Sequence, residues 1–269
     1  MNLLNPSHRQ FLDLPLRGKL HFLSYLLSAS RRNASDDSDG NLILKGWKRN
    51  HHQLPCTSET RMRRAQLFLS LGFQHKSICL LGDDDLVAIE LMKLGFTRVT
   101  VYDCDAKVLN QIEEAIPKHC RPFLELKQMD FHCPIGLRFH FADLVCFDPP
   151  YNREGLELFL KTALACSKQD EGSKLIMMTI PILFQNKRDD WATVERNLQK
   201  GGFLSSETHP NFNSYPLDFF SRFCLFCLSR PYYRQSLTLG EIRFFSDCLV
   251  WDYRRSKSSS SLAFPEEIP

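Results

Sequence analysis

Three consecutive aspartates follow a single glycine in the segment SICLLGDDDL at residues 77–86. An apolar run that ends in glycine and leads into a helical pattern is typical of the first strand, turn and helix of a nucleotide-binding fold. Carboxylates in that turn would repel a carboxylate of a bound cofactor and attract an ammonium group. We therefore predict that Gly82, Asp83 and Asp84 bind the cofactor. The alternative is that one aspartate caps the helix and the others face water.

Two further acidic residues end the next two apolar segments. Asp103 ends RVTVYD and Asp130 ends LELKQMD. In open α/β sheets ligands bind beyond the carboxyl ends of the strands, and the acid after the second strand typically contacts ribose hydroxyls. We predict that Asp103 binds a ribose and that Asp130 lies near an adenine amine. Because aspartate is also common in turns and caps, a structural role is the alternative for both.

The segment DPPYN at residues 148–152 follows a fourth apolar run. Its two prolines make the turn rigid. The Asp148 carboxylate and the Pro149 carbonyl can accept hydrogen bonds from an amine. The Tyr151 ring can add a cation–π attraction of about 0.5–2 kcal/mol. We predict an amine-binding site here; the alternative is a rigid loop. The motif resembles that of adenosylmethionine-dependent enzymes that alkylate exocyclic amino groups.

Strands that alternate with helices must position these residues, which predicts an α/β fold of the Rossmann-like methyltransferase type with a mostly parallel sheet. Thr57 is predicted to cap a helix over 58–73, and Asp105 a helix over 106–116. Predicted strands are 77–82, 98–103, 124–130, 142–148 and 174–181, further helices are 84–93, 155–168 and 190–203, and a late antiparallel pair is 203–209 with 221–229.

The chain has 269 residues, enough for one α/β domain with a small appendage. We predict a small mixed α/β N-terminal region at 1–75 with a polar linker near 31–40. A Rossmann-like catalytic domain at 76–254 and a disordered tail at 255–269 complete the prediction. No stretch approaches eighteen apolar residues, which excludes a membrane span. Ten cysteines without a secretory signal indicate reduced thiols and a cytoplasmic location.

The formal net charge of +3 is too small to favour nucleic acid or membrane as a partner. Cys224 and Cys227 form the only CxxC pair, and residues three apart on a strand face opposite sides. We interpret both as core residues and predict no metal site. We also predict no permanently bound cofactor, and we allow for a homodimer.

The acidic turn discriminates between two adenosyl donors. Adenosylmethionine carries a carboxylate and an ammonium beside its sulfonium, whereas decarboxylated adenosylmethionine keeps only the positive groups. Opposite charges about 4 Å apart attract by roughly 4 kcal/mol at an effective dielectric near 20. A fraction of that energy gives a tenfold preference. The turn therefore favours decarboxylated adenosylmethionine as the donor co-substrate.

Three blocks carry a family resemblance: LGDDDL, DPPYNREGLELFL and the upstream QLPCTSETRMRRA. In this order they resemble the branched-chain polyamine synthases, or bis(aminopropyl)spermidine synthases, over about residues 50–200. The resemblance implies aminopropyl transfer from the decarboxylated donor to a secondary amine of a polyamine such as spermidine, with methylthioadenosine as the leaving group. From the upstream block we assign Thr57 and Glu59 to substrate binding, together with Pro149 and Tyr151.

The acceptor amine must lose a proton, because such amines have pKa values near 10. The resemblance implies that Asp85, the last aspartate of the run, accepts this proton. Asp148 is the second catalytic candidate and would orient the amine for attack.

Two other functions compete with this one. An adenosylmethionine-dependent amino-methyltransferase acting on adenine or another planar amine would explain the fold and DPPY, but not the acidic run. The only compact basic cluster near the predicted site is Arg61, Arg63 and Arg64, which we interpret as a solvated helix face rather than a nucleic-acid contact. A catalytically silent binding module is the third hypothesis.

Overall fold

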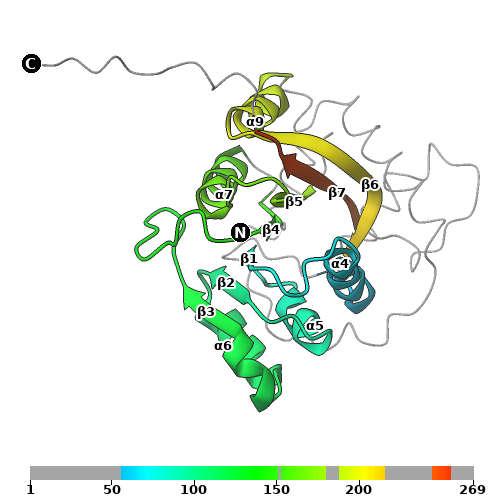
Figure 1. The fold of residues 1–269 in the computed structure, drawn as a ribbon, viewed down its shortest axis with the longest axis vertical. Coiled ribbons are helices and arrows are strands. Elements are labelled where there is room, and N and C mark those ends of the chain that lie inside the picture. Colours follow the sequence, from blue (N-terminus) through cyan, green and yellow to red (C-terminus); the bar gives the residue numbers. More distant parts are fainter. Residues whose placement is uncertain (1–55, 151–152, 180–187, 216–243, 256–269) are drawn as a thin grey trace, which may run out of the picture.

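The described part of the chain forms a central seven-stranded sheet with strand order β3-β2-β1-β4-β5-β7-β6 (Figure 1). The computed structural model describes residues 56–150, 153–179, 188–215 and 244–255. Strands β1 to β5 run parallel, and β7 is antiparallel to both β5 and β6. This arrangement confirms the predicted α/β class with a mostly parallel sheet. The strands are β1 (Ile78–Leu81), β2 (Val99–Asp103), β3 (Leu124–Gln128), β4 (Leu144–Phe147), β5 (Lys174–Thr179), β6 (Phe203–Tyr215) and β7 (Phe244–Tyr253).

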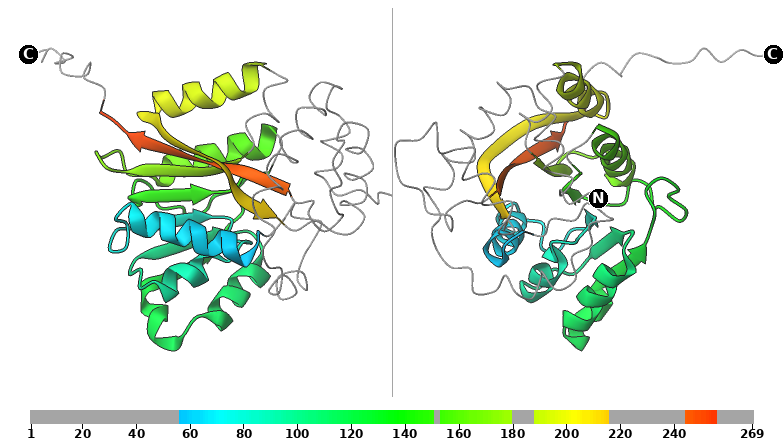
Figure 2. Two further views of the ribbon diagram at one scale, coloured as in Figure 1. Left: turned by 90° about the vertical axis from the view of Figure 1, so that its right-hand side faces the viewer. Right: turned by 180° about the vertical axis from the view of Figure 1, so that it is seen from behind.

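Helices pack on both faces of the sheet because successive strand residues point to opposite sides. In β1, Ile78 belongs to one hydrophobic core and Cys79 to the other. Helices α4 (Ser58–Ser70), α5 (Val87–Lys93) and α6 (Ala106–Ala115) cover the first core, and α7 (Arg153–Cys166) and α9 (Arg188–Lys200) cover the second. The two groups of helices lie on opposite sides of the sheet in Figure 2. A short 3-10 helix, η2 (Lys118–Phe123), precedes β3.

Both predicted helix caps are confirmed. The Thr57 side chain accepts a hydrogen bond from the Thr60 amide, and the Asp105 side chain accepts one from the Lys107 amide. The predicted helix over 84–93 begins later, at Val87, because the aspartates of the turn take non-helical roles. Leu86, which precedes the helix, adopts a left-handed conformation with φ of 59°.

The late antiparallel pair is confirmed for one strand. Residues 203–209 lie in β6, and the strand that pairs with β6 in the described chain is β7. The sequence did not identify β7 as a strand. The segment 221–229 lies outside the described residues, as do most of the 1–75 region, Cys224, Cys227 and the tail from 256. The predicted domain limits stay predictions.

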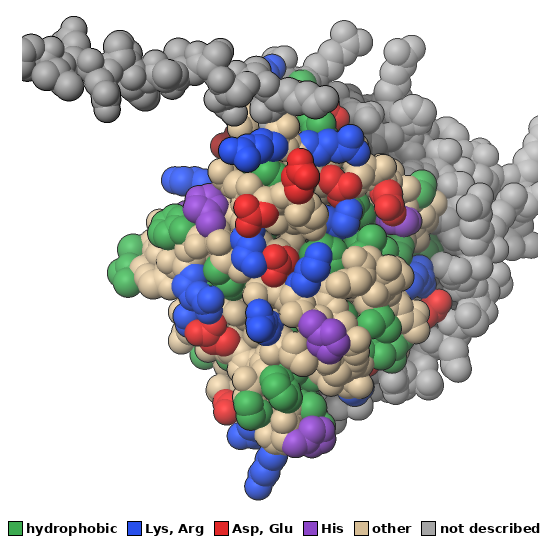
Figure 3. All heavy atoms as spheres, in the orientation of Figure 1, with side chains coloured by type: hydrophobic (Ala, Val, Ile, Leu, Met, Phe, Trp, Pro, Cys, Tyr) green, Lys and Arg blue, Asp and Glu red, His purple; other side chains and the backbone are tan. Residues whose placement is uncertain are grey.

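The surface in the orientation of Figure 3 mixes charges of both signs. Lysine and arginine side chains alternate there with aspartate and glutamate, without a continuous basic stripe on the described atoms of this face. Within the described ranges, no helix combines the length and apolar character that crossing a bilayer requires. The eight cysteines in those ranges are free thiols.

Candidate active site

Asp83 serves as the cap of α5. Its carboxylate accepts hydrogen bonds from the Val87 and Ala88 amides at 2.8 and 2.9 Å, and its side chain is buried. This is the structural role that the sequence left open for one aspartate of the run. Burial raises the pKa of Asp83 to about 8; the two amides oppose the shift, and the nearby carboxylates add to it.

Asp85 is held by two hydrogen bonds inside the site. It is buried, its Oδ1 accepts a hydrogen bond from the Cys56 amide at 2.5 Å, and its Oδ2 accepts one from Arg64 Nη1 at 2.5 Å. One oxygen therefore accepts from the segment just before α4 and the other from the middle of that helix. The assignment of Asp85 as proton acceptor stays a prediction, and a role in holding Arg64 now competes with it.

Asp84, between these two, is only half-buried. In the described part of the chain it accepts no hydrogen bond and forms no ion pair, in contrast to Asp83 and Asp85. Burial raises the pKa of Asp84 well above its ordinary value, and nearby carboxylates raise it further, in the order Asp85, Asp103, Asp148 and Asp83. Asp84 is thus the carboxylate of the run best placed to gain from a cationic ligand.

Asp103 joins the ends of β1 and β2. Its carboxylate accepts hydrogen bonds from the Asp83 amide at 2.9 Å and the Asp105 amide at 2.8 Å. Asp130 is exposed and accepts a hydrogen bond from the His132 amide at 2.9 Å, which is a turn contact. Ribose and adenine binding by Asp103 and Asp130 stay predictions.

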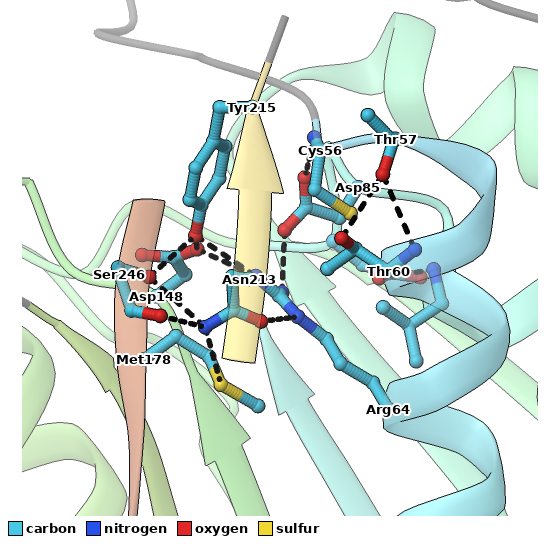
Figure 4. Close-up of polar contacts among 12 residues, drawn as sticks. Cys56, Thr57, Thr60, Arg64, Asp85, Asp148, Met178, Asn213, Tyr215 and Ser246 are labelled. Atoms are coloured by element: carbon cyan, nitrogen blue, oxygen red, sulfur yellow. Dashed lines mark hydrogen bonds and ion pairs between the residues drawn. The ribbon is translucent and has the colours of Figure 1, made fainter. Parts of the chain in front are cut away.

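Asp148 directly follows β4, beside the end of β1, and buried Pro149 comes next. Its Oδ2 accepts hydrogen bonds from Tyr215 OH at 2.5 Å and Arg64 Nη2 at 3.0 Å (Figure 4). Burial raises the pKa of Asp148 to about 6, and Arg64 opposes this shift. Tyr151 lies outside the described residues.

Arg64 corrects one of our interpretations. It is only 2% exposed, so it is not part of a solvated helix face. Its guanidinium bonds to carboxylates of Asp85 and Asp148, because a buried charge must be paired. Arg63, one residue earlier, is half-buried; it pairs with Glu59 at 3.0 Å and donates to the Phe212 carbonyl at 2.7 Å. The helical spacing turns neighbouring arginines to different sides.

Two further predicted residues, Thr57 and Glu59, lie at the N-terminal end of α4. Thr57 caps α4, and its amide donates to the Ser214 carbonyl at 2.9 Å. Glu59 is exposed and paired with Arg63. Neither is directly bonded to an aspartate in the described chain, so substrate binding by Thr57 and Glu59 stays a prediction. No three His, Cys, Asp or Glu side chains in the described ranges are arranged to hold a metal ion.

Gly82 opens the aspartate turn with φ of +68°. A Cβ atom there would lie 3.3 Å from the Phe159 ring of α7. We expect Gly82→Ala to lower the free energy of unfolding by about 1–2 kcal/mol, because alanine resists this backbone conformation and crowds the ring. Gly136→Ala is the matched control, since Gly136 has φ of +79° and open space around its Cβ.

Urea unfolding of both glycine variants measures the two contributions. The Gly136→Ala loss reports backbone conformation alone, and the additional loss in Gly82→Ala reports the contact with Phe159. Equal losses of unfolding free energy in the two variants would show that the Phe159 ring of α7 moves aside without cost and that the turn is not tightly packed against it.

The sequence did not identify three residues of β6 and β7 in this site: Asn213, Tyr215 and Ser246. Asn213 accepts from Arg64 Nε at 2.8 Å, and Ser246 accepts from the Asn213 amide at 2.9 Å. A signal was present, since FNSY places polar residues at the end of a strand. The sequence alone does not give the order of the strands in the sheet, so it could not show that this strand lies near the aspartates.

Comparisons with known proteins give the same family as the motifs. Residues 47–226 match the model of the branched-chain polyamine synthase A C-terminal domain. An uncharacterised protein of Methanocaldococcus jannaschii is 31% identical over 164 residues, which are 60% of this chain and 40% of that protein. The N(4)-bis(aminopropyl)spermidine synthase of Thermococcus kodakarensis is 28% identical, over 61% of this chain and 47% of the relative. The chain thus spans less than half of the length of these relatives.

Solved structures share the fold. The branched-chain polyamine synthase of Thermus thermophilus, in complex with N4-aminopropylspermidine and 5'-methylthioadenosine, matches with a TM-score of 0.59 and 21% identity, over 90% of this chain and 65% of that one. A putative RNA methyltransferase from Pyrococcus horikoshii matches with a TM-score of 0.51 and 14% identity, over 89% of this chain and 98% of that one. Both confirm the Rossmann-like methyltransferase fold. Since the family model covers about two thirds of its residues, the chain belongs to the branched-chain polyamine synthase family.

Proposed function

We propose that this protein transfers the aminopropyl group of decarboxylated adenosylmethionine to an amine of a polyamine such as spermidine. The observation that carries the proposal is the excess of carboxylates at the strand ends. Asp83, Asp84, Asp85, Asp103 and Asp148 lie close enough to influence one another's charge. In the described chain, Arg64 is the cation that is bonded to this group. A site with this charge suits a donor and an acceptor that are both cationic.

The reaction forms a bond between the acceptor nitrogen and the aminopropyl carbon as the bond from that carbon to sulfur breaks. The electron pair of the broken bond stays on sulfur, so the sulfonium becomes the neutral thioether of methylthioadenosine. Before this step the protonated acceptor amine gives a proton to a carboxylate, which frees the nitrogen electron pair that forms the new bond. Because this chemistry needs no group beyond the donor, orientation of the two substrates supplies much of the rate.

We assign the donor to the ends of β1 and β2. The Asp103 carboxylate would bind the ribose and Asp130 would lie near the adenine, as the strand order suggests. Asp84 would bind the aminopropyl ammonium, because it is the aspartate of the run without a partner in the described chain. Gly82 and Asp83 would shape the turn around the donor.

The acceptor would lie between the β4 turn and the start of α4. Asp148 and the Pro149 carbonyl would contact the reacting amine, with the Tyr151 ring beside it. Thr57 and Glu59 would bind more distant amines of the polyamine. Asp85 or Asp148 would receive the proton. The names of two relatives, both N(4)-bis(aminopropyl)spermidine synthases, support a polyamine as the acceptor.

Calorimetric titration of the full chain with each donor tests the proposal. We expect decarboxylated adenosylmethionine to bind at least about tenfold more tightly than adenosylmethionine, because a carboxylate on the ligand meets uncompensated aspartates. Incubation with spermidine should then release methylthioadenosine, measured by chromatography.

Two outcomes contradict this function. Tighter binding of adenosylmethionine, with adenosylhomocysteine formed from a nucleobase or another planar amine, would indicate an amino-methyltransferase. A folded protein that binds neither donor would indicate a module without catalytic activity.

A further inference from the structure

We propose that Arg64 and Tyr215 are positioning residues that clamp one carboxylate oxygen of Asp148 and leave the other for the acceptor amine. This inference rests on the aminopropyl transfer proposed above and adds to it a device that orients the amine. It concerns two residues to which neither the sequence motifs nor the comparisons assign a role.

The clamp is a closed triangle of hydrogen bonds. Tyr215 OH donates to Asp148 Oδ2 at 2.5 Å, and Arg64 Nη2 donates to the same oxygen at 3.0 Å. Arg64 Nη2 also donates to Tyr215 OH at 2.9 Å, which closes the triangle. Figure 4 shows these contacts converging from Arg64 of α4 and Tyr215 of β6 onto Asp148, which follows β4.

The two oxygens of Asp148 consequently differ. Within the described ranges, both hydrogen bonds to its side chain fall on Oδ2, and none falls on Oδ1. The planar carboxyl group is fixed when one oxygen is held from two directions. Oδ1 then has a defined position from which it can accept a hydrogen bond from an amine at the DPPY turn.

Arg64 is itself held rigidly, as a positioning role requires. Its Nε donates to Asn213 Oδ1 at 2.8 Å, and its Nη1 donates to Asp85 Oδ2. The Asn213 amide is fixed in turn by Ser246 Oγ at 2.9 Å and the Met178 sulfur at 3.3 Å. All of these side chains are buried, so the guanidinium plane has little freedom.

The clamp also keeps Asp148 able to carry a negative charge. Burial raises its pKa to about 6, and Asp85 adds to this rise, while Arg64 and the Tyr215 hydroxyl lower it. Asp84 interacts with it from the aspartate turn and Cys146 from β4. Without the hydroxyl, the ionised form loses a hydrogen bond and its pKa must rise.

Tyr215→Phe tests the clamp because it removes one hydroxyl from a side chain that is 1% exposed and keeps the ring. We expect kcat to fall about tenfold at pH 7, the scale of one hydrogen bond to a charged group. The acidic limb of the pH–rate profile should move to higher pH, with activity recovering as pH rises. KM for the donor should change little, since the donor is assigned to other strand ends.

Tyr102→Phe is the matched control. Tyr102 is equally buried, lies on β2, and its hydroxyl accepts a hydrogen bond from the Arg138 amide at 3.4 Å. It belongs to the core on the α7 side of the sheet, so its variant should keep the wild-type pH profile. Matching profiles for the two tyrosine variants would overturn the proposal.

A carbon-13 titration of aspartate carboxyl groups separates this inference from the proposed function. Asp148→Asn identifies the Asp148 signal, and Tyr215→Phe should raise the pKa that this signal reports. A raised pKa in a protein that releases no methylthioadenosine would preserve the clamp and reject the function. An unchanged pKa in an active enzyme would reject the clamp alone.

Discussion

Asp84→Asn should lower kcat/KM for the aminopropyl donor about a hundredfold and at the same time make the folded protein more stable at neutral pH. The loss of activity follows from the proposed pairing of Asp84 with the donor ammonium, since removing one partner of a desolvated charge pair costs about 2–5 kcal/mol. The amide keeps the shape of the side chain and removes its charge.

The gain in stability follows from the raised pKa of Asp84. A carboxyl group whose pKa is higher in the folded than in the unfolded state contributes stability that is fully present below its unfolded pKa. That contribution is lost as pH rises through the folded pKa. Asparagine does not titrate, so the variant does not lose stability in this way. We expect its free energy of unfolding to be about 1 kcal/mol higher than that of the wild type at pH 7 and equal to it near pH 3.

Urea unfolding at these two pH values and steady-state kinetics at pH 7 measure the two effects. Asp170→Asn is the control, because Asp170 is exposed and lies outside the cluster, and a surface change of this kind is worth within about 0.5 kcal/mol. An Asp84→Asn enzyme with wild-type kcat/KM would remove Asp84 from the donor site.

The strand ends were predictable because local patterns determine them. The apolar run before Gly82 and the acid at Asp103 mark the ends of parallel strands, and those ends meet at one edge of the sheet whatever the rest of the chain does. The caps at Thr57 and Asp105 were predictable for the same reason, since a cap depends on residues within one helical turn.

The buried network could not be predicted, since its members are far apart in sequence. Arg64 and Asn213 are separated by 149 residues, and only the pairing of β6 with β7 brings the latter to the cluster. An arginine in a basic stretch looks like a surface residue until its partners are known. The sequence did not predict β7. This strand pairs with β5 on one side and with β6 on the other, and polar residues such as Ser246 lie among its apolar ones.

The roles of the three consecutive aspartates illustrate the same limit. Sequence showed that three carboxylates lie in one turn, and the structure gives each a different environment. Asp83 binds backbone amides, Asp85 binds Arg64, and Asp84 has neither kind of partner among the described residues. The charge of the three carboxylates is therefore enough to predict a cationic ligand, but the structure is needed to say which of the three side chains can bind it.

Asp85→Asn separates the two roles that remain open for Asp85. If it holds Arg64, the variant leaves a buried guanidinium with Asp148 as its remaining ionic partner, and the free energy of unfolding should fall by about 3 kcal/mol. Turnover should fall as well, because a displaced Arg64 no longer positions Asp148. Urea unfolding at pH 7 measures the stability, with Asp84→Asn as the isosteric neighbour that changes it in the opposite direction.

If Asp85 is also the proton acceptor, the loss of turnover is larger. Turnover of the folded variant would fall by about a hundredfold or more, as expected for loss of a general base, while the loss of stability stays the same because the ion pair with Arg64 is removed in either case. Retained activity with lost stability would leave Asp85 a purely structural residue. Both Asp85 oxygens already accept hydrogen bonds at 2.5 Å, from the Cys56 amide and from Arg64 Nη1, so we expect the first result.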